Sequence, residues 1–206
     1  MGHWLGSSVT RTMWRTRVLG EWRMPATGPV ILAVNHSHFV DGPLLLGLSP
    51  RPVRCLVKQE AFVGPIGPFL RSIGQLSVNR TAADRAAVIG ALEVLERGEV
   101  LGIFPEGTRG EGDFASVRAG LAYFALRSGA PVMPVAVLGT SGHEARGRLI
   151  PALPPLRGRV DVVFGDPFQL GDGSGRRTRR MLDEATDTLR DRLASHLKEA
   201  RRETGR

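Results

Sequence analysis

The sequence has a single cysteine, Cys55, among its 206 residues. A lone cysteine cannot form an internal disulfide, and it cannot supply the several thiolates of a zinc ribbon. An oxidising compartment is therefore not indicated. Because Cys55 lies inside an apolar stretch, we expect it in the core rather than as a catalytic nucleophile.

Long apolar runs are also lacking. No segment approaches the roughly 18 consecutive apolar residues that a membrane-spanning helix needs. The first residues show no apolar core of a signal peptide, so we expect a cytoplasmic protein. With 42% hydrophobic and 23% charged residues, the composition is nevertheless globular, and its length suits one domain, over residues 1–206, with a complete core.

Negative charge is scarce relative to positive charge. The chain has 28 basic and 20 acidic residues, a net charge of +8, and its only lysines are Lys58 and Lys198. This balance favours an anionic partner: nucleic acid, an acidic membrane surface or a phosphorylated small substrate. Guanidinium groups suit phosphate, although the arginine bias also fits genomic base composition. Nucleic acid is disfavoured, because the basic residues lack interleaved aromatics and a helix-turn-helix pattern.

Short apolar segments alternate with helical patterns along the chain. Strands are predicted at residues 29–35, 53–57, 75–79, 100–104, 132–138 and 160–164. Helices are predicted at 81–97, where Thr81 to Asp84 form a capping-box variant, at 116–128 and at 176–202. This order predicts an α/β fold with a largely parallel central sheet flanked by helices. Residues 29–168 form its α/β core, and residues 176–204 form a C-terminal helix.

Residues 1–28 differ from the rest, because they contain all three tryptophans and four arginines against one acid. We expect a helical segment here. Indole rings and arginines favour an anionic membrane interface. However, Arg11 and Arg15 fall on the same helical face as Trp14 and Trp22, so packing over the α/β core is an equal alternative.

The first candidate site follows the strand at 29–35, in the segment Asn35-His36-Ser37-His38-Phe39-Val40-Asp41. Strand ends that open onto helices are where α/β proteins place ligands. A carboxylate bonded to one imidazole nitrogen fixes the tautomer and supports the imidazolium that forms when the other nitrogen takes a proton. We therefore predict that His36 is a general base and that Asp41 orients it.

Two further strand ends carry phosphate-binding chemistry. The segment 104–109 (FPEGTR) combines a glycine at 107, which allows close backbone approach, with the hydroxyl of Thr108 and the guanidinium of Arg109. The segment 74–80 (GQLSVNR) ends in Arg80. Together, the three strand ends predict a site for a phosphate-bearing substrate with a reactive hydroxyl.

The segments NHSHFVD, GQLSVNR, FPEGTRG and VMPV resemble the four ordered blocks of the glycerolipid acyltransferases, and most closely those of the bacterial 1-acyl-sn-glycerol-3-phosphate acyltransferases. The resemblance runs from about residue 28 to 138. It implies a glycerol-3-phosphate acyltransferase-like fold. It also implies acyl transfer from acyl-CoA or acyl carrier protein to the hydroxyl of a lysophospholipid, giving phosphatidic acid in phospholipid biosynthesis, with no cofactor or metal.

The same resemblance implies roles for individual residues. The base is His36, and its orienting carboxylate is Asp41. The residues implied to bind the substrate phosphate lie in the second and third blocks, and one additional candidate contact lies between the first and second blocks. These residues are Arg80, Glu106, Gly107, Thr108 and Arg109, with Lys58 as the additional contact.

The blocks also depart from the family pattern, because His38 replaces a common serine, and Ser77 and Asn79 replace an aromatic residue and an acid. These departures leave the acceptor open, so a different lysolipid is an alternative. A second alternative, from another class, is a metal-dependent hydrolase with His36, His38 and Asp41 as ligands. The expected acyltransferase would work on an anionic membrane surface, peripherally at the inner face of the cell membrane.

Overall fold

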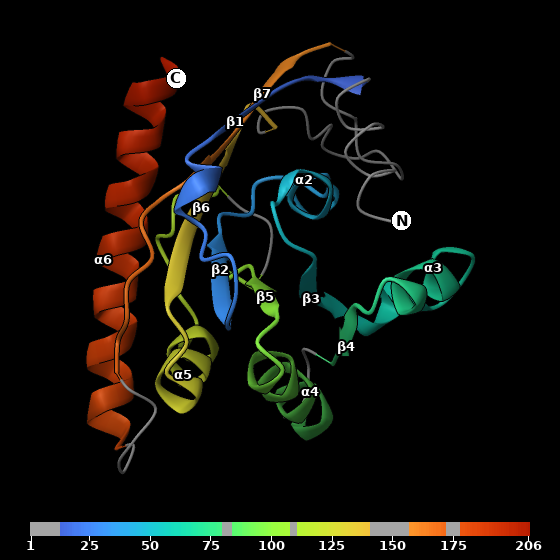
Figure 1. Cartoon of the computed structure of the whole chain (residues 1–206), viewed down its shortest axis with the longest axis vertical. Coiled ribbons are helices and arrows are strands. Elements are labelled where there is room, and N and C mark those ends of the chain that lie inside the picture. Colours follow the sequence, from blue (N-terminus) through green and yellow to red (C-terminus); the bar gives the residue numbers. More distant parts are fainter. Residues whose placement is uncertain (1–12, 80–83, 108–110, 141–156, 172–177) are drawn as a thin grey trace.

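The computed structural model describes residues 13–79, 84–107, 111–140, 157–171 and 178–206 (Figure 1). Within them the strands form one seven-stranded sheet in the order β1-β7-β6-β2-β5-β3-β4. The strands are β1 (Arg15–Leu19), β2 (Val30–Val34), β3 (Val53–Lys58), β4 (Leu76–Val78), β5 (Val100–Ile103), β6 (Val132–Leu138) and β7 (Arg159–Phe164).

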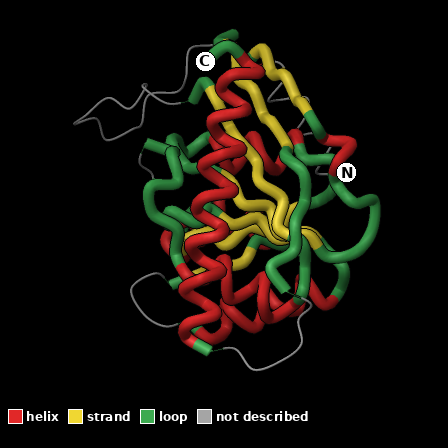
Figure 2. Tube along the Cα trace, turned by 90° about the vertical axis from the view of Figure 1, so that its left-hand side faces the viewer, coloured by secondary structure: helices red, strands yellow, loops and turns green. Residues whose placement is uncertain are grey.

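Helices cover both faces of this sheet. Helix α2 (Asp41–Leu48) packs on one face, and α4 (Arg85–Glu96), α5 (Ala119–Ser128) and α6 (Arg179–Thr204) pack on the other. The remaining described helices are α3 (Ile66–Ser72), beyond the border formed by β4, and the 3-10 turns η1 (Glu21–Arg23) and η2 (Gln59–Phe62). In Figure 2, α6 runs along the face of the sheet for much of the molecule's length. The predicted single α/β domain is therefore confirmed.

The direction of the strands decides where a site can form. Strands β6, β2, β5, β3 and β4 are parallel neighbours, whereas β7 is antiparallel to β6, and β1 is parallel to β7. The sheet is thus largely parallel, as predicted. The carboxyl ends of the five parallel strands meet at one edge, which we call the carboxyl edge.

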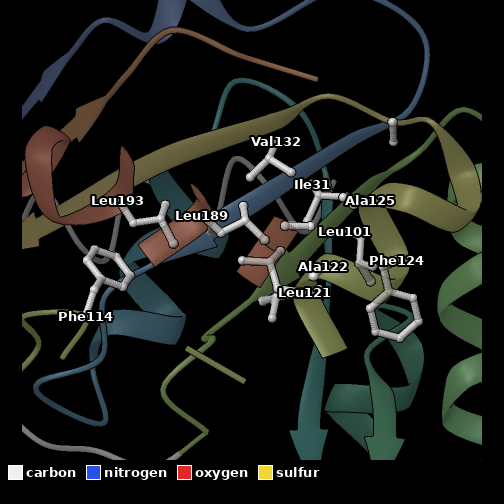
Figure 3. Close-up of a cluster of buried hydrophobic side chains, with 14 of the residues drawn as sticks. Ile31, Leu101, Phe114, Leu121, Ala122, Phe124, Ala125, Val132, Leu189 and Leu193 are labelled. Atoms are coloured by element: carbon white, nitrogen blue, oxygen red, sulfur yellow. The ribbon is translucent and has the colours of Figure 1, made fainter. Parts of the chain in front are cut away.

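Alternating side chains of β2 divide the core between the two faces. Ile31 and Ala33 point into the cluster covered by α4, α5 and α6, shown in Figure 3. Leu32 and Val34 point into a second cluster that contains side chains of α2 and Trp14. All five β2 residues are buried, as expected for a central strand of a parallel sheet.

The expectation of a helical N-terminal segment is wrong for residues 15–19. Residues 15–19 form β1, which pairs in parallel with β7, and Trp14 is buried in the second cluster. Thr16 and Val18 turn inward from this strand while Arg15 and Arg17 are exposed, a two-residue alternation that suits a strand. Of the two open alternatives, packing on the core holds for this part of the segment.

The capping prediction for the helix at 81–97 also needs correction. Helix α4 begins at Arg85, and its N-cap is Asp84, which accepts the backbone N–H of Ala87 at 2.9 Å. The same carboxylate accepts the N–H of Asn79 at 2.8 Å, so it joins the end of β4 to the helix. The Asn79 and Ala87 hydrogen bonds hold the pKa of Asp84 below its usual range. Thr81 falls outside the described residues.

Candidate active site

The site is built on the loop that leaves β2 at the carboxyl edge. Asn35 is buried and exchanges two hydrogen bonds with the backbone of Val137 in β6, donating from Nδ2 at 3.0 Å and accepting at Oδ1 at 2.7 Å. These bonds continue the pairing of the two strands through a side chain. The loop therefore starts from a fixed position, and His36 follows directly.

Asp41, the first residue of α2, is the centre of the loop. Its fully buried carboxylate accepts three hydrogen bonds at Oδ2, from the N–H groups of Ser37 (2.8 Å) and His38 (2.7 Å) and from Nδ1 of His36 (3.3 Å). At Oδ1 it accepts the hydroxyl of Thr140 at 2.7 Å. Four donors fix the orientation of this carboxylate, so the predicted pairing of His36 with Asp41 is present in the structure.

The imidazole of His36 is packed and yet reachable. Its ring centroid lies 4.4 Å from that of Phe104, and its side chain keeps 20% of its surface exposed. When Nδ1 donates its proton to Asp41, the lone pair of the ring is on Nε2. Such an imidazole can accept a proton from a substrate hydroxyl.

Glu106 connects the second strand end to the first. It lies in the turn after β5, is buried, and accepts the backbone N–H of His36 at 3.1 Å. Burial raises the pKa of Glu106, against the lowering effect of the His36 N–H, and the charge of Asp113 raises it further. This contact makes Glu106 a support of the His36 loop. Its assignment to the substrate phosphate stays a prediction.

Gly107 completes that turn in a left-handed conformation, with φ of +72°. A Cβ atom at this position would collide with the guanidinium of Arg118, the residue that precedes α5. Only glycine lets the turn and this guanidinium approach so closely. From the sequence, Arg118 is expected to be a solvent-exposed charge on a helix. Only the structure shows that its guanidinium lies beside Gly107.

The remaining predicted residues are placed only in part. Lys58 is exposed at the carboxyl end of β3, on the same edge as His36. Arg80, Thr108 and Arg109 are not among the described residues, and their roles stay predictions. Thr140 was not predicted, although one signal exists: it comes two residues after β6, the strand that pairs with β2.

The metal-hydrolase alternative gains no support from the geometry. His38 is buried, and its Nδ1 accepts the N–H of Val40 at 3.4 Å. Among the residues that the structure describes, no group of three His, Cys, Asp or Glu side chains is arranged to hold a metal ion. The site offers an imidazole next to a buried carboxylate, and a glycine turn.

Comparison with known proteins finds relatives that match most of this chain. The Acyltransferase family model matches residues 15–138. A 1-acyl-sn-glycerol-3-phosphate acyltransferase of Bacillus subtilis is 27% identical over 179 residues, which cover 86% of this chain and 85% of that protein. A lyso-ornithine lipid O-acyltransferase of Pseudomonas aeruginosa is 34% identical over 137 residues, 65% of this chain and 51% of that protein.

A solved structure shows the same architecture. The crystal structure of the 1-acyl-sn-glycerophosphate acyltransferase PlsC from Thermotoga maritima matches with a TM-score of 0.68 and 25% sequence identity, covering 95% of this chain and 78% of that one. The family match spans the strands and loops that carry His36, Asp41 and Glu106. The chain therefore belongs to the acyltransferase family and is an O-acyltransferase of the lysophospholipid acyltransferase type.

Proposed function

We propose that this protein transfers a fatty acyl group from an acyl thioester, either acyl-CoA or acyl-acyl carrier protein, to the free hydroxyl of a lysophospholipid. The observation that supports this most directly is the His36–Asp41 pair, at 3.3 Å, on the carboxyl edge of the sheet. The pair supplies a positioned base, and thioester acylation of an alcohol needs little more from side chains.

The reaction proceeds in one acyl-transfer sequence without a covalent enzyme intermediate. Nε2 of His36 takes the proton of the acceptor hydroxyl while the oxygen attacks the thioester carbonyl carbon. Asp41 keeps the other ring proton on Nδ1 and stabilises the imidazolium. When the tetrahedral intermediate collapses, the C–S bond breaks and the imidazolium returns the proton to the leaving thiolate.

The acceptor phosphate binds beside this pair. Arg80, Thr108 and Arg109 contact it with charged and hydroxyl groups, and the turn at Gly107 allows the backbone to come close. Lys58 is an additional contact from the same edge. Glu106 keeps the loop in place through the N–H of His36.

The acceptor that we favour is 1-acyl-sn-glycerol-3-phosphate, the substrate named for the Bacillus subtilis relative. The Pseudomonas aeruginosa relative favours a second candidate, a lyso-ornithine lipid. No described helix is both long and apolar enough to span a bilayer. We propose that the enzyme acts peripherally on the inner face of the cell membrane, where such acceptors are embedded.

The test is an acylation assay with radiolabelled acyl-CoA and acyl-acyl carrier protein across a panel of lysolipids that includes both candidates. We expect labelled phosphatidic acid from lysophosphatidic acid with at least one of the two acyl donors. If lyso-ornithine lipid alone is acylated, the proposed acceptor is wrong and the proposed acyl-transfer reaction stands. Hydrolysis of the thioester without transfer to any lysolipid would overturn the proposal.

A further inference from the structure

Three large apolar side chains are exposed close together in the segment that joins β3 to β4. Val63 is 80% exposed, Ile66 is 61% exposed and Phe69 is 59% exposed. Ile66 and Phe69 are three residues apart in α3, so they share one face of the helix. We call these three residues the α3 ridge. Single exposed apolar residues are ordinary, but a group of this size within seven residues points to a contact surface.

The fold presents the α3 ridge rigidly. Gly67 is buried, and a Cβ atom there would collide with the backbone oxygen of Phe62, so α3 packs tightly on η2. Arg71 donates to the same oxygen at 3.2 Å and lies 5.7 Å from the Phe62 ring. Pro65 caps the helix, and its fixed backbone restricts the turn further. These contacts fix the orientation of α3, and so they hold Ile66 and Phe69 on its exposed face.

The α3 ridge follows a strand that ends at the carboxyl edge. The chain enters η2 from the carboxyl end of β3, on the edge where the His36 loop leaves β2. In Figure 1, α3 stands at the outer border of the molecule beyond β3 and β4, on the opposite side from α6. The α3 ridge can therefore contact a lipid bilayer while the carboxyl edge of the sheet faces the same bilayer.

Two exposed cations flank the α3 ridge along the chain. Residues 51–79 contain four basic side chains and one acid, Glu60. Two of the four, Lys58 and Arg71, are exposed five residues before and two residues after the ridge, and Glu60 is exposed between Lys58 and the ridge. The other two basic side chains bond to carbonyl groups and to Glu99 away from the ridge. Exposed apolar side chains between cations are the pattern that binds an anionic lipid surface, because the apolar groups enter the headgroup layer and the cations attract it.

The N-terminal segment is less suited to this role where the structure describes it. Trp14 is buried, and the guanidiniums of Arg17 and Arg23 are paired with Asp161 at 2.8 Å and with Asp166 at 3.2 Å. Trp22 is exposed but follows β1, which runs opposite to β2, so it belongs to the other edge of the sheet.

We infer that the α3 ridge is the docking surface by which this enzyme binds an anionic lipid bilayer. The inference rests on the proposed function, in which the acceptor is drawn from a bilayer. The ridge seats the carboxyl edge against the membrane, and the acceptor reaches His36 without leaving the interface for bulk water.

The test is co-sedimentation with vesicles made of equal parts phosphatidylglycerol and phosphatidylcholine. The variant Ile66→Ser/Phe69→Ser removes the helical part of the ridge, and Ile89→Ser/Met181→Ser removes two exposed apolar side chains elsewhere as a matched control. We expect the first variant to bind about tenfold more weakly or worse, and the control to bind like the unmodified protein. Equal binding by both variants would overturn the inference.

A second readout does not depend on the serine variant remaining folded. A polarity-sensitive fluorophore attached to Phe69→Cys should shift to the blue when these vesicles are added, whereas the same label on Ile89→Cys should not. Cys55 is buried and does not compete for the label. The absence of a blue shift at residue 69 would contradict the inference. A blue shift that appears without vesicles would also contradict it, because it would show that the ridge binds another copy of the protein.

An activity control separates the two proposals. Ile66→Ser/Phe69→Ser should acylate a short-chain, water-soluble acceptor at the unmodified rate and lose activity on acceptor embedded in vesicles. If the unmodified protein acylates lysolipids but the variant is unaffected with vesicles, the docking surface is wrong and the proposed function stands. If the ridge governs vesicle binding but no lysolipid is acylated, the proposed function is wrong and the binding surface stands.

Discussion

The hydroxyl of Thr140 donates a 2.7 Å hydrogen bond to Oδ1 of Asp41, and both side chains are fully buried. Thr140 follows β6, and Asp41 begins α2, so this bond ties the loop after one strand to the helix after its neighbour. It occupies the oxygen that His36 does not use. Ser37 adds a further contact, 3.1 Å from the Thr140 hydroxyl.

Thr140→Val should therefore lower kcat by about tenfold or more, because a buried acceptor without its donor costs on the order of 1–3 kcal/mol and the carboxylate can turn away from His36. Thr140→Ser keeps the hydroxyl and should retain most of the rate. Steady-state kinetics should show the loss in kcat rather than in the KM of the acceptor. A valine variant with unchanged kcat would show that Thr140 only packs.

Asp161 should be a main electrostatic support of the sheet border. Its buried carboxylate contacts the guanidiniums of Arg17 at 2.8 Å, Arg159 at 3.1 Å and Arg206 at 3.0 Å. Asp161→Asn leaves these partly exposed cations without their counter-charge and should lower the free energy of unfolding by about 3 kcal/mol in urea titrations. Asp166→Asn, which breaks an exposed pair, should cost less than about 1 kcal/mol. Equal losses for the two variants would contradict this assignment.

Cys55 should be chemically inert in the folded protein. Burial raises the pKa of its thiol to about 12, so the thiol stays protonated at about pH 8, and only the thiolate attacks alkylating agents. Mass spectrometry after iodoacetamide treatment should find Cys55 unmodified in the native protein and modified in urea. Fast alkylation of the native protein would contradict the burial. Because the mechanism has no enzyme nucleophile, folded Cys55→Ala should also keep its turnover.

The sequence predicted the parts of the fold that local patterns determine. The strand at 132–138 coincides with β6, and the helices at 116–128 and 176–202 contain most of α5 and α6. β1 was predicted as helix because its partner, β7, is more than 140 residues away, and nothing local signals that pairing. Helix α4 begins at Arg85 rather than at the predicted residue 81, because Asp84 accepts hydrogen bonds from Asn79 and Ala87 and caps the helix there.

The site was predictable where one segment holds both partners, and not where it is assembled from several strands. His36 and Asp41 lie five residues apart, so their pairing could be predicted from the segment alone. Thr140 reaches Asp41 across 99 residues, and Glu106 reaches the backbone of His36 across 70. Those contacts depend on the order of β6, β2 and β5 in the sheet.

Arg80→Ala and Arg109→Ala should weaken use of the phosphate-bearing acceptor. Each removes a charge-assisted contact of roughly 1.5–3 kcal/mol, which corresponds to about a ten- to hundredfold rise in the acceptor KM. The KM of the acyl donor should change much less. Arg180→Ala, at an exposed pair on α6, is the matched control and should leave both values unchanged. If the arginine variants also leave them unchanged, the phosphate binds elsewhere on the carboxyl edge.

The central claim is that His36, oriented by Asp41, takes the proton of the acceptor hydroxyl. The most direct measurement is kcat for labelled acyl transfer to lysophosphatidic acid by His36→Ala, with thermal unfolding recorded to confirm that the variant is folded. We predict that kcat falls on the order of 10²–10⁴-fold, as is typical when a positioned general base is removed, and that Asp41→Asn also lowers kcat. A folded His36→Ala protein with near-normal kcat would contradict it.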